Sequence, residues 1–277
     1  MVELLSSLTS PRLQRVDAEG RLAVKHTDRG SVIDRLYQSG AAKIRFPASP
    51  ESRACEAVLI NTAGGLTGGD RLSWSFRAGE GVKLICTSQA CERIYRSRDG
   101  EPARLSVKID VDKGARVSWI PQETILFDGC ALERSVEADL ASDASLLIVE
   151  ALVFGRAAMG ETVRRVSLRD RWTIRRDGRL VFADAVSFAG NDMEDQLQRR
   201  AVAKGHRALA TVALVAPDAE RHLDHVRERF PDLASSAFAG KLLARLTANE
   251  AHDLRKMLIP LAEVLSGENA LPKVWAA

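Results

Sequence analysis

Oxygen-bearing side chains recur where the apolar stretches of this sequence end. They are Asp70, Thr87, Ser88, Gln89, Tyr95, Ser97, Gln122, Glu123, Asp128 and Glu161, with Arg96 among them. Carboxylate, hydroxyl and amide oxygens are ligands for divalent cations. If the loops that carry them converge at one end of a β scaffold, they could line a wet passage or an ion path. Taken singly, a turn or cap role explains each of these residues.

The sequence lacks common signatures of catalysis. It has no Gly-x-Ser-x-Gly nucleophile elbow and no His-Glu-x-x-His zinc pair. We therefore find no acid–base machinery in its spacing. A β-sandwich hydrolase that uses carboxylates such as Asp70 and Asp128 is a competing interpretation, and the lack of a second motif acid at a defined spacing counts against it.

A glycine-rich segment, VLINTAGGLTGGDRLSW at residues 58–74, places two glycine pairs directly before Asp70. Phosphate-binding loops carry a lysine or open a helix at such a point. Here no lysine follows, and the alternation of Leu72, Trp74 and Phe76 is typical of a strand. The segment predicts a strand, a glycine-rich loop and a second strand, in which the glycines allow positive φ or close approach of another backbone.

The elements that must carry these loops are strands, because residues 21–186 alternate almost throughout with period two. Turn signals predict four hairpins. They pair residues 22–27 with 32–37, 72–77 with 82–87, 104–111 with 115–120, and 163–175 with 179–186. The absence of intervening helical patterns predicts a mainly β fold, an antiparallel multi-stranded β-sandwich or β-helix-like body over about 21–216.

One strand, predicted at residues 146–154, is apolar throughout except for Glu150. Such a run is typical of a central strand covered on both faces. We expect Glu150 to reach solvent from an edge or end position, since an uncompensated buried charge is costly. A buried functional carboxylate is the alternative.

The period changes after Pro217, where a small C-terminal helical part is predicted at about 217–265. Asp218 can cap a helix to about residue 230, and a second helical tract covers 234–265 with a break near 247–249. Pro260 should kink or end this tract. Its apolar stripe, formed by Leu254, Met257, Leu258 and Leu261, fits core packing or partner docking. We expect an N-terminal segment at 1–20 that is free to be flexible, and a single domain at 21–277.

Composition points to a globular chain with no nucleic-acid or membrane partner. Hydrophobic residues make up 45%, and 40 basic and 37 acidic residues give a net charge of +3. No export signal or apolar stretch of membrane-spanning length is present, so we expect a cytoplasmic location. The four cysteines form no Cys-x-x-Cys pair, which favours free thiols, with Cys86 and Cys130 buried.

Five blocks occur in a characteristic order. They are LINTAGGLTGGDRLSW at 59–74, TSQACERIYRS at 87–97, WIPQETILFDGC at 119–130, VFGRAAMGE at 153–161 and LPKVW at 271–275. In order and spacing they resemble the urease accessory protein family UreD, also called UreH. The chain departs from that family at Thr62-Ala63, where a proline is frequent.

The resemblance implies a non-enzymatic protein of predominantly β structure with C-terminal helices. Members of the family form a complex with UreF and, through UreF, with the GTPase UreG. The complex docks on the urease apoprotein and assists delivery of nickel, which is thought to pass through an internal water-filled tunnel. The resemblance thus implies nickel(II) in transit and no tightly bound cofactor.

Asp70 and Glu161 match acids that close two of the family blocks, and the resemblance implies transient contact of both with nickel. Thr87, Ser88, Tyr95 and Arg96 would line or shape the passage. The stripe of Leu254, Met257, Leu258 and Leu261 would dock a partner. A plain interaction module that never contacts metal is the alternative.

Overall fold

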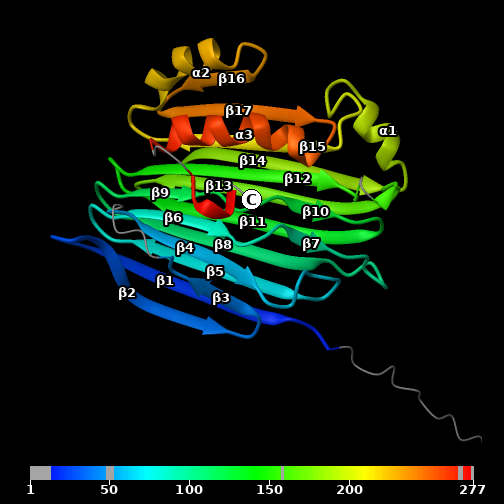
Figure 1. Ribbon diagram of the computed structural model, residues 1–277, viewed down its shortest axis with the longest axis horizontal. Coiled ribbons are helices and arrows are strands. Elements are labelled where there is room, and N and C mark those ends of the chain that lie inside the picture. Colours follow the sequence, from blue (N-terminus) through cyan, green and yellow to red (C-terminus); the bar gives the residue numbers. More distant parts are fainter. Residues whose placement is uncertain (1–13, 48–52, 157–158, 268–270, 276–277) are drawn as a thin grey trace, which may run out of the picture.

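Two β-sheets packed face to face make up most of the molecule (Figure 1). The computed structural model describes residues 14–47, 53–156, 159–267 and 271–275. Sheet A has the order β14-β13-β11-β8-β5-β1-β2. Its strands are β1 (Asp17–Thr27), β2 (Gly30–Ser39), β5 (Arg71–Ala78), β8 (Ala103–Val111), β11 (Cys130–Leu140), β13 (Val166–Arg176) and β14 (Arg179–Gly190).

Sheet B has the order β16-β17-β15-β12-β9-β6-β4-β3, with β10 beside β12 and β7 beside β10. Its strands are β3 (Ala42–Arg45), β4 (Cys55–Asn61), β6 (Lys83–Ser88), β7 (Glu92–Ile94), β9 (Arg116–Trp119), β10 (Thr124–Leu126), β12 (Ser145–Phe154), β15 (Ala208–Val215), β16 (Ala234–Phe238) and β17 (Lys241–Ala248). The helices are α1 (Met193–Gln198), α2 (Leu223–Arg229) and α3 (Ala251–Ser266), with 3-10 turns η2 (Ala219–His222) and η3 (Lys273–Trp275).

The chain winds as a β-solenoid. From β4 to β13 it passes back and forth between the sheets, so β4, β6, β9 and β12 lie in sheet B while β5, β8, β11 and β13 lie in sheet A. Neighbouring strands of one sheet therefore come from successive coils and run parallel. Antiparallel strands complete both ends of each sheet. The mainly β, β-helix-like prediction is confirmed, and the prediction of antiparallel sheets is wrong.

Two of the four predicted hairpins form, β1–β2 and β13–β14. The other two are wrong, because β5 and β6 lie in different sheets, as do β8 and β9. A tight turn does join β8 to β9, where Ala115 N donates to Asp112 O at 3.1 Å. Turn chemistry alone therefore cannot distinguish a hairpin from a turn that leads to the opposite sheet.

Alternation places the core between the sheets. On β8, Leu105, Val107 and Ile109 are buried, while Arg104 and Lys108 are exposed. β12 is buried along its whole length because α3 covers its outer face, so the central strand is confirmed. The four cysteines are free, and Cys86 and Cys130 are buried as predicted.

The predicted helical part contains more strand than expected. η2 and α2 fall within the first predicted helix, although Asp218 makes no side-chain cap and pairs with Arg221 instead. Residues 234–248 form β16 and β17, so the helical prediction there is wrong. Strand pairing decides this segment, because β17 pairs with β15 and β16 pairs with β17, although the local sequence also suits a helix.

α3 matches the last part of the second predicted helix and runs through Pro260 to Ser266, so the predicted end near residue 259 is wrong and the alternative of a kink stays a prediction. The helix packs on β12, β15 and β17 at the upper end of Figure 1. We attribute its continuity to this packing, through buried Leu258, Leu261 and Leu265, which offsets the hydrogen bond that the proline removes.

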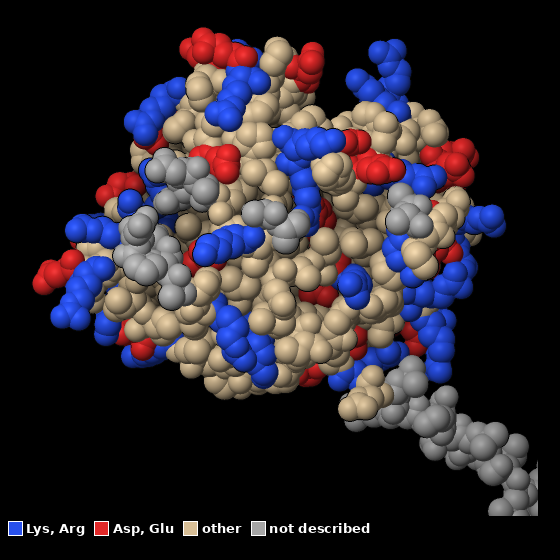
Figure 2. Space-filling view, viewed as in Figure 1, with Lys and Arg blue, Asp and Glu red and all other residues tan. Residues whose placement is uncertain are grey.

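β1 begins at Asp17, inside the predicted N-terminal segment, and residues 1–13 of that segment lie outside the described residues. Within the described part of the chain, no helix is long and apolar enough to cross a membrane. Figure 2 shows Lys and Arg interspersed with Asp and Glu over one face, with uncharged surface between them.

Candidate functional site

The glycine-rich loop, residues 62–70, carries the chain from β4 of sheet B to β5 of sheet A, so the strand–loop–strand prediction is confirmed. Gly65 has φ +148, and a Cβ there would lie 2.4 Å from the Tyr95 ring. A Cβ on Gly68 would lie 2.5 Å from Glu101 O. Glycine at these positions therefore lets the loop pack against the segment that follows β7.

Asp70 is buried and holds this loop in place. Its Oδ1 accepts from Val16 N at 2.8 Å, and its Oδ2 accepts from Thr67 N at 2.7 Å. Both oxygens thus satisfy backbone donors. In this structure Asp70 therefore has the turn role, which the sequence offered as an alternative to ion contact.

Glu161 has a similar position in the loop after β12. Its Oε1 accepts from Asp128 N at 3.2 Å, and its Oε2 accepts from Arg156 N and Nε at 3.1 and 2.9 Å. Burial raises the pKa of Glu161, but the hydrogen bonds from Arg156 and from Asp128 N together outweigh burial, so this pKa is lowered. The carboxylate therefore braces two loops at neutral pH.

Tyr95 and Arg96 connect these loops. Tyr95 donates from its hydroxyl to Gly64 O at 3.1 Å, and Arg96 pairs with Asp128 at 2.8 Å. The backbone carbonyl of Arg96 accepts from Thr67 Oγ1 at 2.9 Å. Asp128 also accepts hydrogen bonds from two backbone N–H groups. Both acids named in the hydrolase interpretation, Asp70 and Asp128, therefore bind backbone groups. The structure thus joins Asp70, Tyr95, Arg96 and Glu161 in one brace.

Thr87 and Ser88 lie at the end of β6 and hold other parts of the chain. Thr87 Oγ1 accepts from the buried Trp275 indole at 3.2 Å, which anchors the C-terminal LPKVW block. Ser88 Oγ accepts from Gln122 N at 2.8 Å. Six residues were predicted to contact nickel or line its passage: Asp70, Thr87, Ser88, Tyr95, Arg96 and Glu161. Of these, Ser88 lines the interior cavity described next, and the other five do not.

An ionic cluster lies between the sheets. Arg134 of β11 donates from Nε to Asp170 of β13 at 3.0 Å and from Nη1 to Glu150 of β12. Their side chains are only 1–4% exposed. Trp119 Nε1 also donates to Glu150 Oε1 at 2.7 Å, and Thr124 Oγ1 accepts from Arg134 Nη1 at 3.1 Å. We call Arg134, Glu150 and Asp170 the buried triad.

The triad holds one guanidinium and two carboxylates, so with all three groups ionised it has one negative charge in excess. Burial raises the pKa of Glu150, and the Arg134 guanidinium opposes this effect only in part. The expectation that Glu150 reaches solvent is wrong. β12 is central, and Arg134 supplies the counter-ion that makes the burial tolerable.

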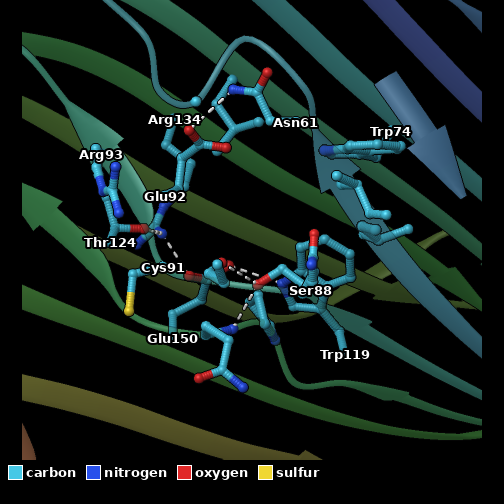
Figure 3. A pocket seen from close by; sticks show the side chains of 18 residues that line it. Asn61, Trp74, Ser88, Cys91, Glu92, Arg93, Trp119, Thr124, Arg134 and Glu150 are labelled. Carbon is cyan, nitrogen blue, oxygen red and sulfur yellow. Dashed lines mark hydrogen bonds and ion pairs between the residues drawn. The ribbon is translucent and has the colours of Figure 1, made fainter. Parts of the chain in front are cut away.

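Two cavities meet at the triad. Cavity one, about 160 Å³, extends from Ser88, Cys91 and Glu92 to Arg134 and Glu150 (Figure 3). Cavity two, about 100 Å³, continues from Arg134, Glu150 and Asp170 to Asp184 and Arg245. Each cavity is lined by partly exposed residues at one end and by buried core residues at the other. Together they outline a path across the molecule that the Arg134–Glu150 pair interrupts.

Glu92 stands in the wall of cavity one and accepts from Asn61 Nδ2 at 3.0 Å (Figure 3). Burial raises its pKa to about 7, against the opposing hydrogen bond from Asn61. Asp184, in the wall of cavity two, pairs with Arg245 at 2.7 Å. Carboxylates therefore lie along both cavities as well as between them.

Comparison with known proteins shows the family of this chain. The model of a family described as UreD urease accessory protein matches residues 16–276. The chain belongs to this family. A urease accessory protein UreD of Rhizobium etli is 47% identical over 269 residues, covering 96% of this chain and 97% of the relative. One from Chelativorans sp. (strain BNC1) is 46% identical over 267 residues, 95% of each chain.

In this UreD family member, most of the apolar stripe of α3 that was expected to dock a partner is buried in the protein core. Leu254, Leu258 and Leu261 are fully buried against sheet B, and only Met257 of the four is exposed. The core-packing alternative therefore holds for the three leucines, and they are not available to a partner in this structure.

Sequence reasoning missed Arg134, Asp170, Glu92 and Asp184. A signal for two of them is present in the alternation. Arg134 shares the inward face of β11 with Leu132 and Val136, and Asp170 shares that of β13 with Leu168. Opposite charges on the apolar faces of two neighbouring strands predict an interior pair once the strands are known to be adjacent.

Proposed function

We propose that this UreD family member assists urease maturation by passing nickel(II) through its interior, from cavity one past the buried triad to cavity two. The observation that carries this proposal is that Arg134 and Glu150 line both cavities. An ion that enters beside Glu92 thereby meets Glu150 at the midpoint and Asp184 beyond it.

The donor set supports transit over storage. Nickel(II) accepts carboxylate, imidazole and water, and a path that releases its ion needs weak, separated ligands. Among the residues that the structure describes, no three His, Cys, Asp or Glu side chains gather to hold a metal ion. Glu92, Glu150 and Asp184 offer single carboxylates in succession, so nickel is cargo here and no resident cofactor is proposed.

The triad's charge supports brief residence at the midpoint. With Glu150 ionised, two carboxylates against one guanidinium attract a divalent cation, while Arg134 keeps the site from binding as two free carboxylates would. Passage requires the Arg134–Glu150 contact to open. Arg134 can keep Asp170 as its partner while nickel contacts Glu150.

Family membership supports a choice of partners, which is part of the proposal. We propose a non-enzymatic role in a cytoplasmic complex with UreF, with UreG through UreF, and with the urease apoprotein. Asp70 and Glu161, for which the resemblance implies nickel contact, enter as loop braces that hold one end of the solenoid. Direct nickel contact by either acid stays a prediction.

The test of this function is the nickel content of urease in nickel-limited cells. Deleting this protein should lower both bound nickel and urease activity, and restoring it should recover both. Unchanged nickel content after deletion would contradict the proposal. If variants of cavity residues deliver nickel normally while deletion abolishes delivery, the protein is an interaction module without metal contact.

A further inference from the structure

Strand β2 exposes an unusual amount of apolar surface. Val32, Ile33, Leu36 and Tyr37 are each between 36% and 51% exposed, within six consecutive residues. Large apolar side chains scattered singly over a surface need no explanation, whereas a contiguous group marks an interaction site. β2 therefore has the character of an interface.

Among the residues that the structure describes, no strand pairs with the outer edge of β2. It ends the strand order of sheet A, pairs with β1, and follows the lower margin of the molecule in Figure 1. At its first end, Ser31 N donates to Arg53 O at 3.0 Å, so the open edge begins after Ser31. An edge strand with unpaired backbone groups is a template for another strand.

We propose that β2 pairs antiparallel with β2 of a second copy of this chain, joining two A sheets into one. The sequence VIDRLY (32–37), which lies on the open part of the edge, is complementary to itself in this direction. The pairs are Val32 with the partner's Tyr37, Ile33 with the partner's Leu36, and Asp34 with the partner's Arg35, each repeated by symmetry.

The faces agree with this register. A two-fold axis perpendicular to the sheet sets each side chain opposite one from the same face. Ile33 and Leu36 lie opposite Val24 and Leu22 on the inward face of β1, while Val32 and Tyr37 lie opposite Lys25 and Arg21 on the outward face. A bulge that skips Asp34 in the pairing with β1 produces this grouping, and each of the two apolar pairs stays on one face.

The central charges favour the same register. The Arg35 side chain is 88% exposed and lies 3.9 Å from Asp34, while Asp34 contacts Lys25 at 2.9 Å. Charges and bulges usually protect an edge from pairing. Here the acid precedes the base, so antiparallel pairing with a copy joins opposite charges at both symmetric positions. This surface is independent of the nickel path.

Charge reversal tests the register directly. Sedimentation equilibrium of the purified full chain over a concentration series should show a monomer–dimer equilibrium. Asp34→Arg and Arg35→Asp should each weaken dimerisation by about tenfold or more, because like charges then face each other twice. The double variant D34R/R35D should restore it. Leu180→Arg, at an exposed site on the opposite edge strand β14, should leave it unchanged.

A cross-link provides a second measurement that is independent of charge. An oxidised mixture of Ile33→Cys and Leu36→Cys chains should give a disulfide-linked dimer in greater yield than either variant alone. A monomer at every concentration, or a dimer that both single reversals leave intact, would overturn the proposal. Failure of the double variant to recover the dimer would overturn the register.

Discussion

Arg134 and Glu150 come from opposite sheets and form an ion pair in the interior, where both residues line two cavities. The pair therefore serves two purposes in our account. It fixes the spacing of the sheets at one coil of the solenoid, and it holds a carboxylate at the midpoint of the proposed nickel path.

Removing the guanidinium of Arg134 should destabilise the folded protein. We expect Arg134→Met to lower the free energy of unfolding by about 3–5 kcal/mol, because two buried carboxylates lose their counter-ion. Urea denaturation at pH 7.5 measures it. Arg104→Met, a half-exposed control on the neighbouring strand β8, should cost about 0–1 kcal/mol. Equal losses in the two variants would show that the triad has no special structural role.

The glycine-rich loop offers a matched pair of substitutions. Gly65→Ala should cost more than about 2 kcal/mol, because its Cβ meets Tyr95 and the Arg93 carbonyl in a backbone conformation that L residues avoid. Gly64→Ala meets open space and should cost about 1 kcal/mol for its positive φ. Thermal unfolding of both variants checks the order, and a reversed order would contradict the packing described for this loop.

Glu92 should give a pH-dependent stability. Its pKa is raised from 4.5 to about 7 by burial, so the folded state holds a proton that the unfolded state releases. The resulting loss of stability is absent below pH 4.5, grows as pH rises, and is complete above about pH 7. Glu92→Gln cannot ionise. Its Tm, minus that of the unmodified protein, should therefore rise between pH 5 and 7, and a constant difference would contradict the assignment.

How much could be predicted from sequence depended on the range of the deciding interaction. The alternation on β8 and the continuous apolar run of β12 specified strand type and burial locally. Strand partners did not follow, because the turn between β8 and β9 has the same chemistry whether it returns to the same sheet or crosses. Residues 234–248 form strands despite their helical pattern, because β17 pairs with β15 and β16 pairs with β17.

The candidate site shows the same limit. Glu150 stands out in the sequence as an isolated acid, but its burial depends on Arg134, sixteen residues away and in the other sheet. The resemblance points to Asp70 and Glu161, and the carboxylates of both accept hydrogen bonds from backbone groups of the loops. Each cavity is lined by residues from several coils of the solenoid, so no local sequence pattern predicts it.

The most direct test of the nickel path is Glu150→Gln, with nickel per urease active site as the measurement after maturation at limiting nickel. Glutamine keeps the shape of the side chain and an acceptor for Trp119, and it leaves Arg134 paired with Asp170. Exposed Glu137→Gln on β11 is the control. Our account predicts reduced nickel loading by Glu150→Gln with the maturation complex intact and normal loading by the control. Full loading by a folded Glu150→Gln variant would contradict it.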